Sequence, residues 1–156
     1  MKKNLKVGFV GLTHLGLTYL AASSDKGFKV IGIDLNQNKI NKLKKFDIEY
    51  KEPNLQKTIF QNKRSILFSS NLNNLKDCNI VFVSQDITTD DKGKGDFKSL
   101  KKLINSTSKF LNKKSVLVIL SQVHPGFTRT VHFDHTRLYY QVETLIFGDA
   151  LARALE

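Results

Sequence analysis

The chain has 156 residues, 40% of them hydrophobic and 25% charged, with a net charge of +11. This length is enough for one domain with its own core, and we expect residues 1–156 to form a single domain. No apolar run approaches the ~20 residues of a membrane span, and the single Cys78 excludes an internal disulfide. We expect a cytoplasmic protein.

The positive charge favours anionic partners, because 25 Lys and Arg residues oppose 14 Asp and Glu residues. The lysines are spread along the chain, with a modest cluster at Lys39, Lys42, Lys44 and Lys45. They are not interleaved with aromatic residues, as they would be in a groove for single-stranded nucleic acid. The pattern favours a solvated lysine-rich surface, and we expect no nucleic-acid partner.

Apolar runs and helix-like segments alternate along the chain. The runs are continuously apolar, which is typical of parallel strands buried on both faces. This alternation predicts an α/β fold, doubly wound and Rossmann-like, with a mostly parallel sheet and helices on both faces. The expected strands are 7–10, 30–33, 66–68, 80–83, 116–120 and 138–140, and the expected helices are 15–26, 36–46 and 97–111.

The first strand leads into a glycine turn, Gly11 to Gly16, with Thr13 at the position of the middle glycine in the usual G-x-G-x-x-G. We expect Gly11 to make the tight turn and Gly16 to let the helix pack closely on the sheet. The helix N-terminus would offer backbone N–H groups to a diphosphate. The Thr13 hydroxyl could donate to that phosphate, although its side chain takes up room. The alternative is a plain strand-to-helix turn.

Asp34 ends the second strand. Its separation from the glycine turn is close to the ~20 residues expected for the acid that binds the adenosine ribose. An acid there favours NAD, because it would repel the 2′-phosphate of NADP. The alternative role for Asp34 is the N-cap of the helix that follows from Asn36. Lys39 is open to two interpretations, a contact to the cofactor's phosphates or adenosine, or a surface lysine.

Loops at the carboxyl ends of parallel strands meet at one edge of the sheet, where ligands bind. The sequence therefore predicts that four loops converge on one crevice. Two other segments hold residues of chemical interest. Pro53 is expected near the first turn of a helix, and 132–135 holds possible metal ligands but is interpreted as a polar loop, with no metal site. The converging loops are 11–16, 34–36, 84–91 and 121–126.

Ordered motifs along almost the whole chain resemble the N-terminal, NAD-binding domain of the UDP-glucose/GDP-mannose dehydrogenase family. Glu52-Pro53-Asn54-Leu55 is similar to the family's Glu-Pro-Gly-Leu, and 121–126 is similar to Ser-Thr-Val-Pro-Pro-Gly. The other matching segments are 10–17, 30–34, 79–83, 91–93 with Asp96, 140–143 and 148–150.

The resemblance implies an NAD-dependent dehydrogenase that oxidises the 6-hydroxyl of a nucleotide sugar, such as UDP-glucose or UDP-N-acetylmannosamine, twice to the uronic acid. The family's nucleophilic cysteine and its partner lysine lie in later domains, and its usual dimer forms through a central helical domain. Cys78 does not match the nucleophile and is interpreted as a core or surface thiol. We expect residues 1–156 alone to be inactive, with Leu155 and Glu156 contributed by a cloning vector.

The departures from the family cluster at the expected crevice. Ile87 replaces a Thr that contacts NAD, Gln122 a Thr that binds NAD and positions water, and Phe147 a Glu near the substrate. Asp86 is an added acid that would attract the nicotinamide charge or face solvent. His14 replaces an aromatic residue and is expected to fill space.

The resemblance implies two groups of site residues. Glu143, the retained first glutamate, and Gln122 are the catalytic candidates. The alternatives are a non-catalytic NAD-binding or regulatory module of the same family, a basic nucleic-acid binder, and a β-hydroxyacid dehydrogenase, which shares the glycine turn. The cofactor-binding candidates are Gly11, Leu12, Thr13, His14, Leu15, Gly16, Asp34, Lys39, Ile87 and Gln122.

Overall fold

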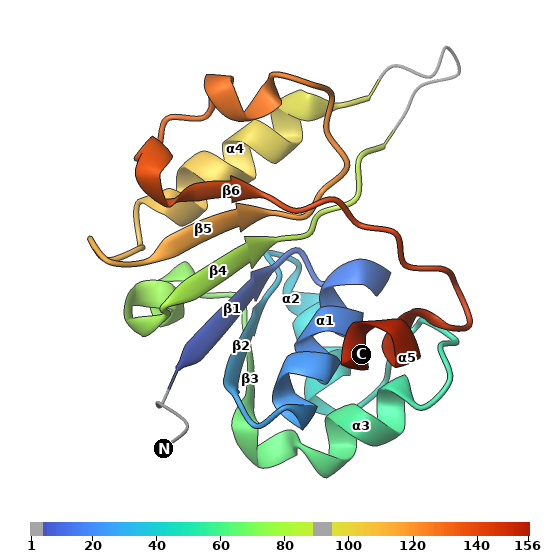
Figure 1. Cartoon of the computed structure of the whole chain (residues 1–156). Helices are drawn as coiled ribbons and strands as arrows, with labels where there is room; N and C mark the ends of the chain where they lie inside the picture. Colours follow the sequence, from blue (N-terminus) through green and yellow to red (C-terminus); the bar gives the residue numbers. More distant parts are fainter. Residues whose placement is uncertain (1–4, 89–94) are drawn as a thin grey trace.

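The computed structural model describes residues 5–88 and 95–156, and its sheet has six strands in the order β3-β2-β1-β4-β5-β6 (Figure 1). Every neighbouring pair of these strands is parallel. The predicted doubly wound, parallel α/β fold is therefore confirmed. The strands are β1 Lys6–Val10, β2 Lys29–Ile33, β3 Ile66–Ser69, β4 Ile80–Val83, β5 Val116–Ile119 and β6 Leu138–Tyr140.

Helices lie between the strands, and one more helix follows the last strand. Three of them match the predicted helices to within a few residues, whereas α5 was not predicted. The helices are α1 His14–Asp25, α2 Gln37–Lys44, α3 Leu55–Gln61, α4 Phe97–Ser108 and α5 Ala150–Leu155. Short 3-10 segments lie at Lys63–Ser65, Leu72–Asp77, Phe127–Thr130 and His135–Arg137.

The core forms two layers, because side chains alternate between the two faces of each buried strand. On one face, Val7 and Phe9 pack against residues of α1, α2, α3 and α5. On the other face, Val10 and Val81 pack against α4 and the 3-10 segment Leu72–Asp77. Helices therefore cover both faces of the sheet, as expected.

The chain crosses the sheet between β3 and β4, so that β1 lies beside both β2 and β4. A strand order that reverses in this way creates a crevice at the carboxyl ends of the two central strands. The glycine turn follows β1 at this point, and the loop after β4 lies next to it. Topology therefore places the candidate site between β1 and β4.

Pro53 lies in a turn directly before a helix, as expected. α3 begins at Leu55, and Asn54, its N-cap, has a left-handed φ of 61°. Pro53 therefore immediately precedes the cap. The resemblance segment 91–93 lies outside the described residues. Leu155 ends α5 and packs against the core on the α1 face.

Candidate functional site

The two glycines of the turn have the structural roles that their positions predict. Gly11 has a φ of +88°, and a Cβ added to it would lie 2.8 Å from the backbone nitrogen of Gln85. A Cβ on Gly16 would collide with the Gly11 carbonyl oxygen and lie 2.5 Å from the Ser84 Oγ. The turn, the start of α1 and the loop after β4 are therefore packed closely enough to require both glycines.

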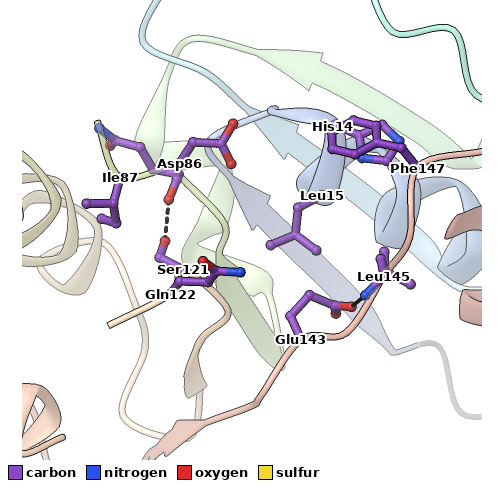
Figure 2. Close-up of a pocket in the computed structure, with 10 residues that line it drawn as sticks. His14, Leu15, Asp86, Ile87, Ser121, Gln122, Glu143, Leu145 and Phe147 are labelled. Carbon is purple, nitrogen blue, oxygen red and sulfur yellow. Dashed lines mark hydrogen bonds between the residues drawn. The ribbon is translucent and has the colours of Figure 1, made fainter. Parts of the chain in front are cut away.

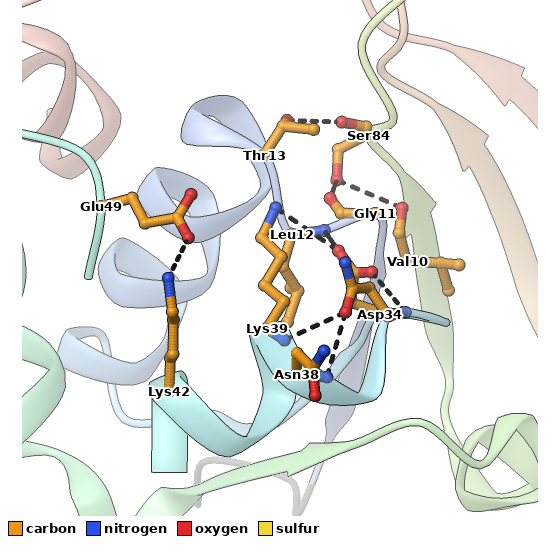
Figure 3. Close-up of polar contacts among 11 residues, drawn as sticks. Val10, Gly11, Leu12, Thr13, Asp34, Asn38, Lys39, Lys42, Glu49 and Ser84 are labelled. Carbon is orange, nitrogen blue, oxygen red and sulfur yellow. Dashed lines mark hydrogen bonds and ion pairs between the residues drawn. The ribbon is translucent and has the colours of Figure 1, made fainter. Parts of the chain in front are cut away.

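Thr13 fastens this turn to the end of β4 (Figure 3). Its hydroxyl donates a hydrogen bond to the Ser84 carbonyl oxygen at 2.8 Å, and the Ser84 hydroxyl donates to the Gly11 carbonyl oxygen at 2.8 Å. A hydroxyl has one proton to donate. In this structure the Thr13 hydroxyl therefore holds the turn together, and its donation to phosphate stays a prediction.

Asp34 joins the end of β2 to the glycine turn (Figure 3). Its Oδ2 accepts a hydrogen bond from the Leu12 N–H at 3.1 Å and lies 3.5 Å from the Lys39 Nζ. The N-cap of α2 is Asn36, whose side chain accepts from the Asn38 and Lys39 N–H groups. The N-cap role considered for Asp34 is therefore wrong: its Oδ2 contacts the turn, while its Oδ1 accepts from the N–H of the cap residue Asn36 at 3.0 Å.

Lys39 is a partly buried neighbour of Asp34. Its side chain is 19% exposed, and its Nζ lies 5.7 Å from the centre of the Tyr50 ring as well as close to Asp34. The interpretation of Lys39 as an ordinary surface lysine is therefore wrong. Its ammonium group places positive charge beside the carboxylate that ends β2.

A cavity of about 350 Å³ opens beside Asp34, over the carboxyl ends of β1 and β2. The Asp34 side chain is 17% exposed, whereas neighbouring Leu35 is 57% exposed. The cavity therefore offers one carboxylate and apolar surface at its rim. Its lining residues are Val10, Gly11, Thr13, Asp34, Leu35, Gln85, Ser99 and Leu103.

A second cavity of about 310 Å³ lies on the other side of the turn (Figure 2). Gln85 lines both cavities, so they adjoin at the loop after β4. The expected single crevice is therefore divided in two, with Asp34 in the first part and the loop after β5 in the second. The second cavity is lined by His14, Leu15, Gln85, Asp86, Ile87, Ser121, Gln122, Glu143, Leu145 and Phe147.

The catalytic candidates Glu143 and Gln122 both line the second cavity. The Glu143 Oε1 accepts a hydrogen bond from the Leu145 N–H, and Oε2 is buried. Burial of Tyr19, together with the nearby Glu143 carboxylate, raises the pKa of the Tyr19 phenol far above its usual value. Gln122 is exposed, and the adjacent Ser121 hydroxyl donates to the Gln85 carbonyl oxygen at 2.6 Å.

Sequence reasoning missed the role of Glu52. The Glu52 Oε2 lies 2.9 Å from the His14 Nε2 and 2.9 Å from the Gly148 nitrogen, while Oε1 accepts from the Leu151 N–H at 3.3 Å. Burial raises the pKa of Glu52, but the hydrogen bonds from Gly148, His14 and Leu151 outweigh burial and lower it below its usual range. No sequence signal links these residues, because they come from three distant parts of the chain.

Phe147 lies over His14 and links the C-terminal segment to the glycine turn. The two rings are stacked with 4.2 Å between their centres and 23° between their planes, and Figure 2 shows one ring over the other. His14 is only 7% exposed. It therefore fills space, as expected, and it also makes a polar contact to Glu52.

Two other sequence features have structural explanations. Cys78 is fully buried, so the core interpretation is correct, and burial raises the pKa of its thiol to about 11. The Asp134 carboxylate accepts hydrogen bonds from Thr136 and Arg137. Within residues 5–88 and 95–156, no group of three or more potential metal ligands was found.

The polar groups around the first cavity suit a dinucleotide. The first N–H groups of a helix have no partner within the helix, and its dipole favours a negative ligand there. α1, which has 12 residues, starts at His14 beside the cavity. A carboxylate offers about four lone-pair positions, so Asp34 can accept ribose hydroxyls in addition to its present donors. These residues therefore fit NAD.

The fold and the divided crevice define a dinucleotide-binding domain of the Rossmann type. A family model described as "UDP-glucose/GDP-mannose dehydrogenase family, NAD binding domain" matches residues 5–141. The chain belongs to this family, and NAD, the cofactor predicted from the sequence, is confirmed for the domain.

Curated relatives agree with this assignment. A UDP-N-acetyl-D-glucosamine 6-dehydrogenase of Pseudomonas aeruginosa is 32% identical over 129 residues, which cover 81% of this chain and 29% of that protein. A UDP-N-acetyl-D-mannosamine dehydrogenase of Methanococcus vannielii is 25% identical over 138 residues, covering 84% of this chain and 31% of that protein. The chain thus spans less than a third of these relatives' length.

Solved structures show the same fold. A UDP-D-ManNAc dehydrogenase from Pyrococcus horikoshii superposes with a TM-score of 0.87 at 15% identity, covering 96% of this chain and 38% of that one. A GDP-mannose dehydrogenase from Pseudomonas aeruginosa gives 0.85 at 18% identity, covering 94% and 38%. In the part of the chain that the structure describes, no helix is long and apolar enough to span a membrane.

Proposed function

We propose that this chain is the cofactor half of an NAD-dependent nucleotide-sugar 6-dehydrogenase and that its divided crevice binds NAD. The observation that carries the proposal is the 3.1 Å contact between the Asp34 carboxylate and the Leu12 N–H. It joins the acid suited to the adenosine ribose directly to the turn suited to the diphosphate.

Each part of the cofactor has a candidate partner. Asp34 accepts the hydroxyls of the adenosine ribose, and exposed Leu35 offers apolar surface to the adenine. The N-terminus of α1 faces the diphosphate. The rest of the cofactor then extends past the turn into the second cavity, toward Ile87 and Gln122.

The whole protein's reaction is the oxidation of the 6-hydroxyl of a UDP-sugar to the uronic acid. NAD supplies the hydride acceptor for this chemistry when bound. Within this chain, Glu143 is the candidate for contacts to the reacting group, because its carboxylate lines the second cavity with Oε2 buried there. Gln122 offers an amide that both donates and accepts there. A cytoplasmic location and a homodimer belong to the same proposal.

Calorimetric titration of the chain with NAD and NADP tests the cofactor assignment. We expect NAD to bind more tightly than NADP, because the Asp34 carboxylate repels a 2′-phosphate. Asp34→Asn should weaken NAD by about tenfold or more, since hydrogen bonds to a charged group contribute ~1.5–3 kcal/mol. Asp77→Asn is the matched control, because Asp77 precedes β4 at the opposite edge of the sheet and pairs with Lys6.

A non-catalytic NAD-binding module is the second candidate. Ile87 and Phe147 support it, because both place apolar side chains in the second cavity, where the family has polar ones. Turnover of UDP-glucose and UDP-N-acetylmannosamine by the full-length protein distinguishes the two. Turnover at an ordinary rate, with a kcat on the order of 10 s⁻¹, would rule out the non-catalytic module.

A further inference from the structure

Phe147 combines high exposure with a fixed orientation. Its side chain is 78% exposed, although one face of its ring is stacked on His14 at 4.2 Å. An exposed aromatic ring on a loop is ordinarily free to rotate between rotamers. Here one face is covered, and the other face remains open.

The support beneath Phe147 is itself held in place. His14 is buried, its Nε2 lies 2.9 Å from the Glu52 Oε2, and the Tyr50 ring approaches its edge with 5.7 Å between ring centres. Glu52 also accepts from the Gly148 N–H at 2.9 Å, directly after Phe147 in the chain. The His14 ring below Phe147 and the Gly148 N–H beside it are therefore both in polar contact with the Glu52 carboxylate.

The stacked pair lies at one end of the second cavity, and both rings line it. The cavity begins at the turn suited to the diphosphate and also contains the Asp86 and Glu143 carboxylates. If the adenosine half of NAD occupies the first cavity, the nicotinamide half enters this one. A cationic ring is attracted both to carboxylates and to the face of an aromatic ring.

We propose that the open face of Phe147 is a stacking platform for the nicotinamide ring of NAD, supported by His14 and Glu52. This inference rests on the proposed function, because it requires the adenosine half to bind beside Asp34. Phe147 is a positioning residue in this assignment: it orients the reactive ring. A carboxylate in place of the Phe147 ring could not orient the nicotinamide by stacking.

The chain contains no tryptophan, so Phe147→Trp creates a single fluorophore at the platform. We expect NAD to quench this fluorescence on binding, whereas ADP-ribose, which lacks the nicotinamide, should bind without comparable quenching. Ile146→Trp is the matched control, because Ile146 is 54% exposed but does not line the cavity. Its fluorescence should respond equally to NAD and ADP-ribose.

Affinity gives a second readout with the unlabelled chain. Aromatic stacking contributes ~0.5–1.5 kcal/mol beyond buried area, so Phe147→Leu should weaken NAD by about 2- to 12-fold. The affinity for ADP-ribose should stay unchanged, which also shows that the variant is folded.

The outcomes separate this inference from the proposed function. If the unaltered chain binds neither NAD nor ADP-ribose, the proposed function fails. If NAD binds but Phe147→Leu leaves its affinity unchanged and the fluorescence of the Phe147→Trp variant does not respond, the platform alone is overturned. Quenching of that variant by UDP-glucose without any by NAD would also overturn it, because the ring would then contact the sugar nucleotide.

Discussion

The Nε2 of His14 lies 2.9 Å from the Oε2 of Glu52, which joins the glycine turn to the segment before α3. The same carboxylate accepts from backbone N–H groups of Gly148 and Leu151, and so holds the C-terminal segment against the turn. One buried side chain thereby connects three distant parts of the chain at the end of the second cavity.

Glu52→Gln should lower the free energy of unfolding by about 1–3 kcal/mol at neutral pH, because buried donors lose a charged acceptor. The pKa of Glu52 is lowered in the folded state. Its stabilisation is therefore fully present above the unfolded pKa of ~4.3 and is lost as the pH falls through the folded pKa. Urea unfolding followed by circular dichroism between about pH 3 and pH 7, chosen to span that range, measures both effects.

Glu49→Gln is the control for that variant. Glu49 pairs with Lys42 at 3.1 Å, but both side chains are more than half exposed, and such pairs contribute ~0–1 kcal/mol. An equal loss of stability in the two variants, with the same pH profile, would contradict the role assigned to Glu52.

Thr13→Gly should lower stability by about 1–2 kcal/mol, because it removes the hydrogen bond to Ser84 and adds backbone freedom. It should leave the affinity for NAD unchanged or higher, since the Thr13 hydroxyl is engaged by Ser84 and its side chain takes up room at the turn. Thr13→Ser, which keeps the hydroxyl, should retain more stability. A tenfold loss of NAD affinity in Thr13→Gly, measured by calorimetry, would mean that the hydroxyl binds phosphate after all.

Gly16→Ala should destabilise the fold by about 1–3 kcal/mol, the usual cost of overpacking. Its Cβ would collide with the Gly11 carbonyl oxygen, which is backbone and cannot move aside cheaply. Ser23→Ala on the same helix, at a partly exposed position, should change stability by no more than ~0.5 kcal/mol. Thermal unfolding of the two variants compares them, and equal midpoints would contradict the close packing of α1 on the turn.

Cys78 should be inert toward a thiol reagent in the folded protein at about pH 8. Its pKa is raised to about 11 by burial, so little thiolate forms, and the thiol is inaccessible. In urea the same thiol should react fully, and its labelling rate at low urea should follow the unfolding equilibrium. Fast labelling of the folded chain would show that the segment between the 3-10 turn Leu72–Asp77 and β4 opens locally without global unfolding.

The strands could be predicted because their signal is local. Runs such as 80–83 are apolar throughout, and strands buried on both faces of a parallel sheet have that composition. The glycine turn could also be predicted, because Gly11 and Gly16 meet steric requirements that arise within a few residues of each other. Helix ends were less exact: α2 and α4 end at Lys44 and Ser108, before the predicted ends at 46 and 111. Phe46 and Leu111 pack against the core from outside the helices, so their apolar character did not mark a helical position.

Side-chain partners across the site could not be predicted in the same way. Asp34 and Asn36 are both suitable caps for α2, and only the position of the turn shows that Asp34 bonds to Leu12 instead. Glu52 meets His14 across 38 positions of sequence, and no local pattern encodes that contact. Long-range packing decides which of several chemically suitable residues acts at the site.

Amide chemical-shift mapping of the isotope-labelled chain during an NAD titration tests the central claim, that the divided crevice binds NAD, most directly. We expect the largest changes at Leu12, His14 and Leu15, together with changes at Asp86 and Gln122 across the second cavity. ADP-ribose should reproduce the changes at the turn but not those at Gln122. An absence of shifts at the turn at saturating NAD, or shifts confined to the lysines of α2, would contradict the claim.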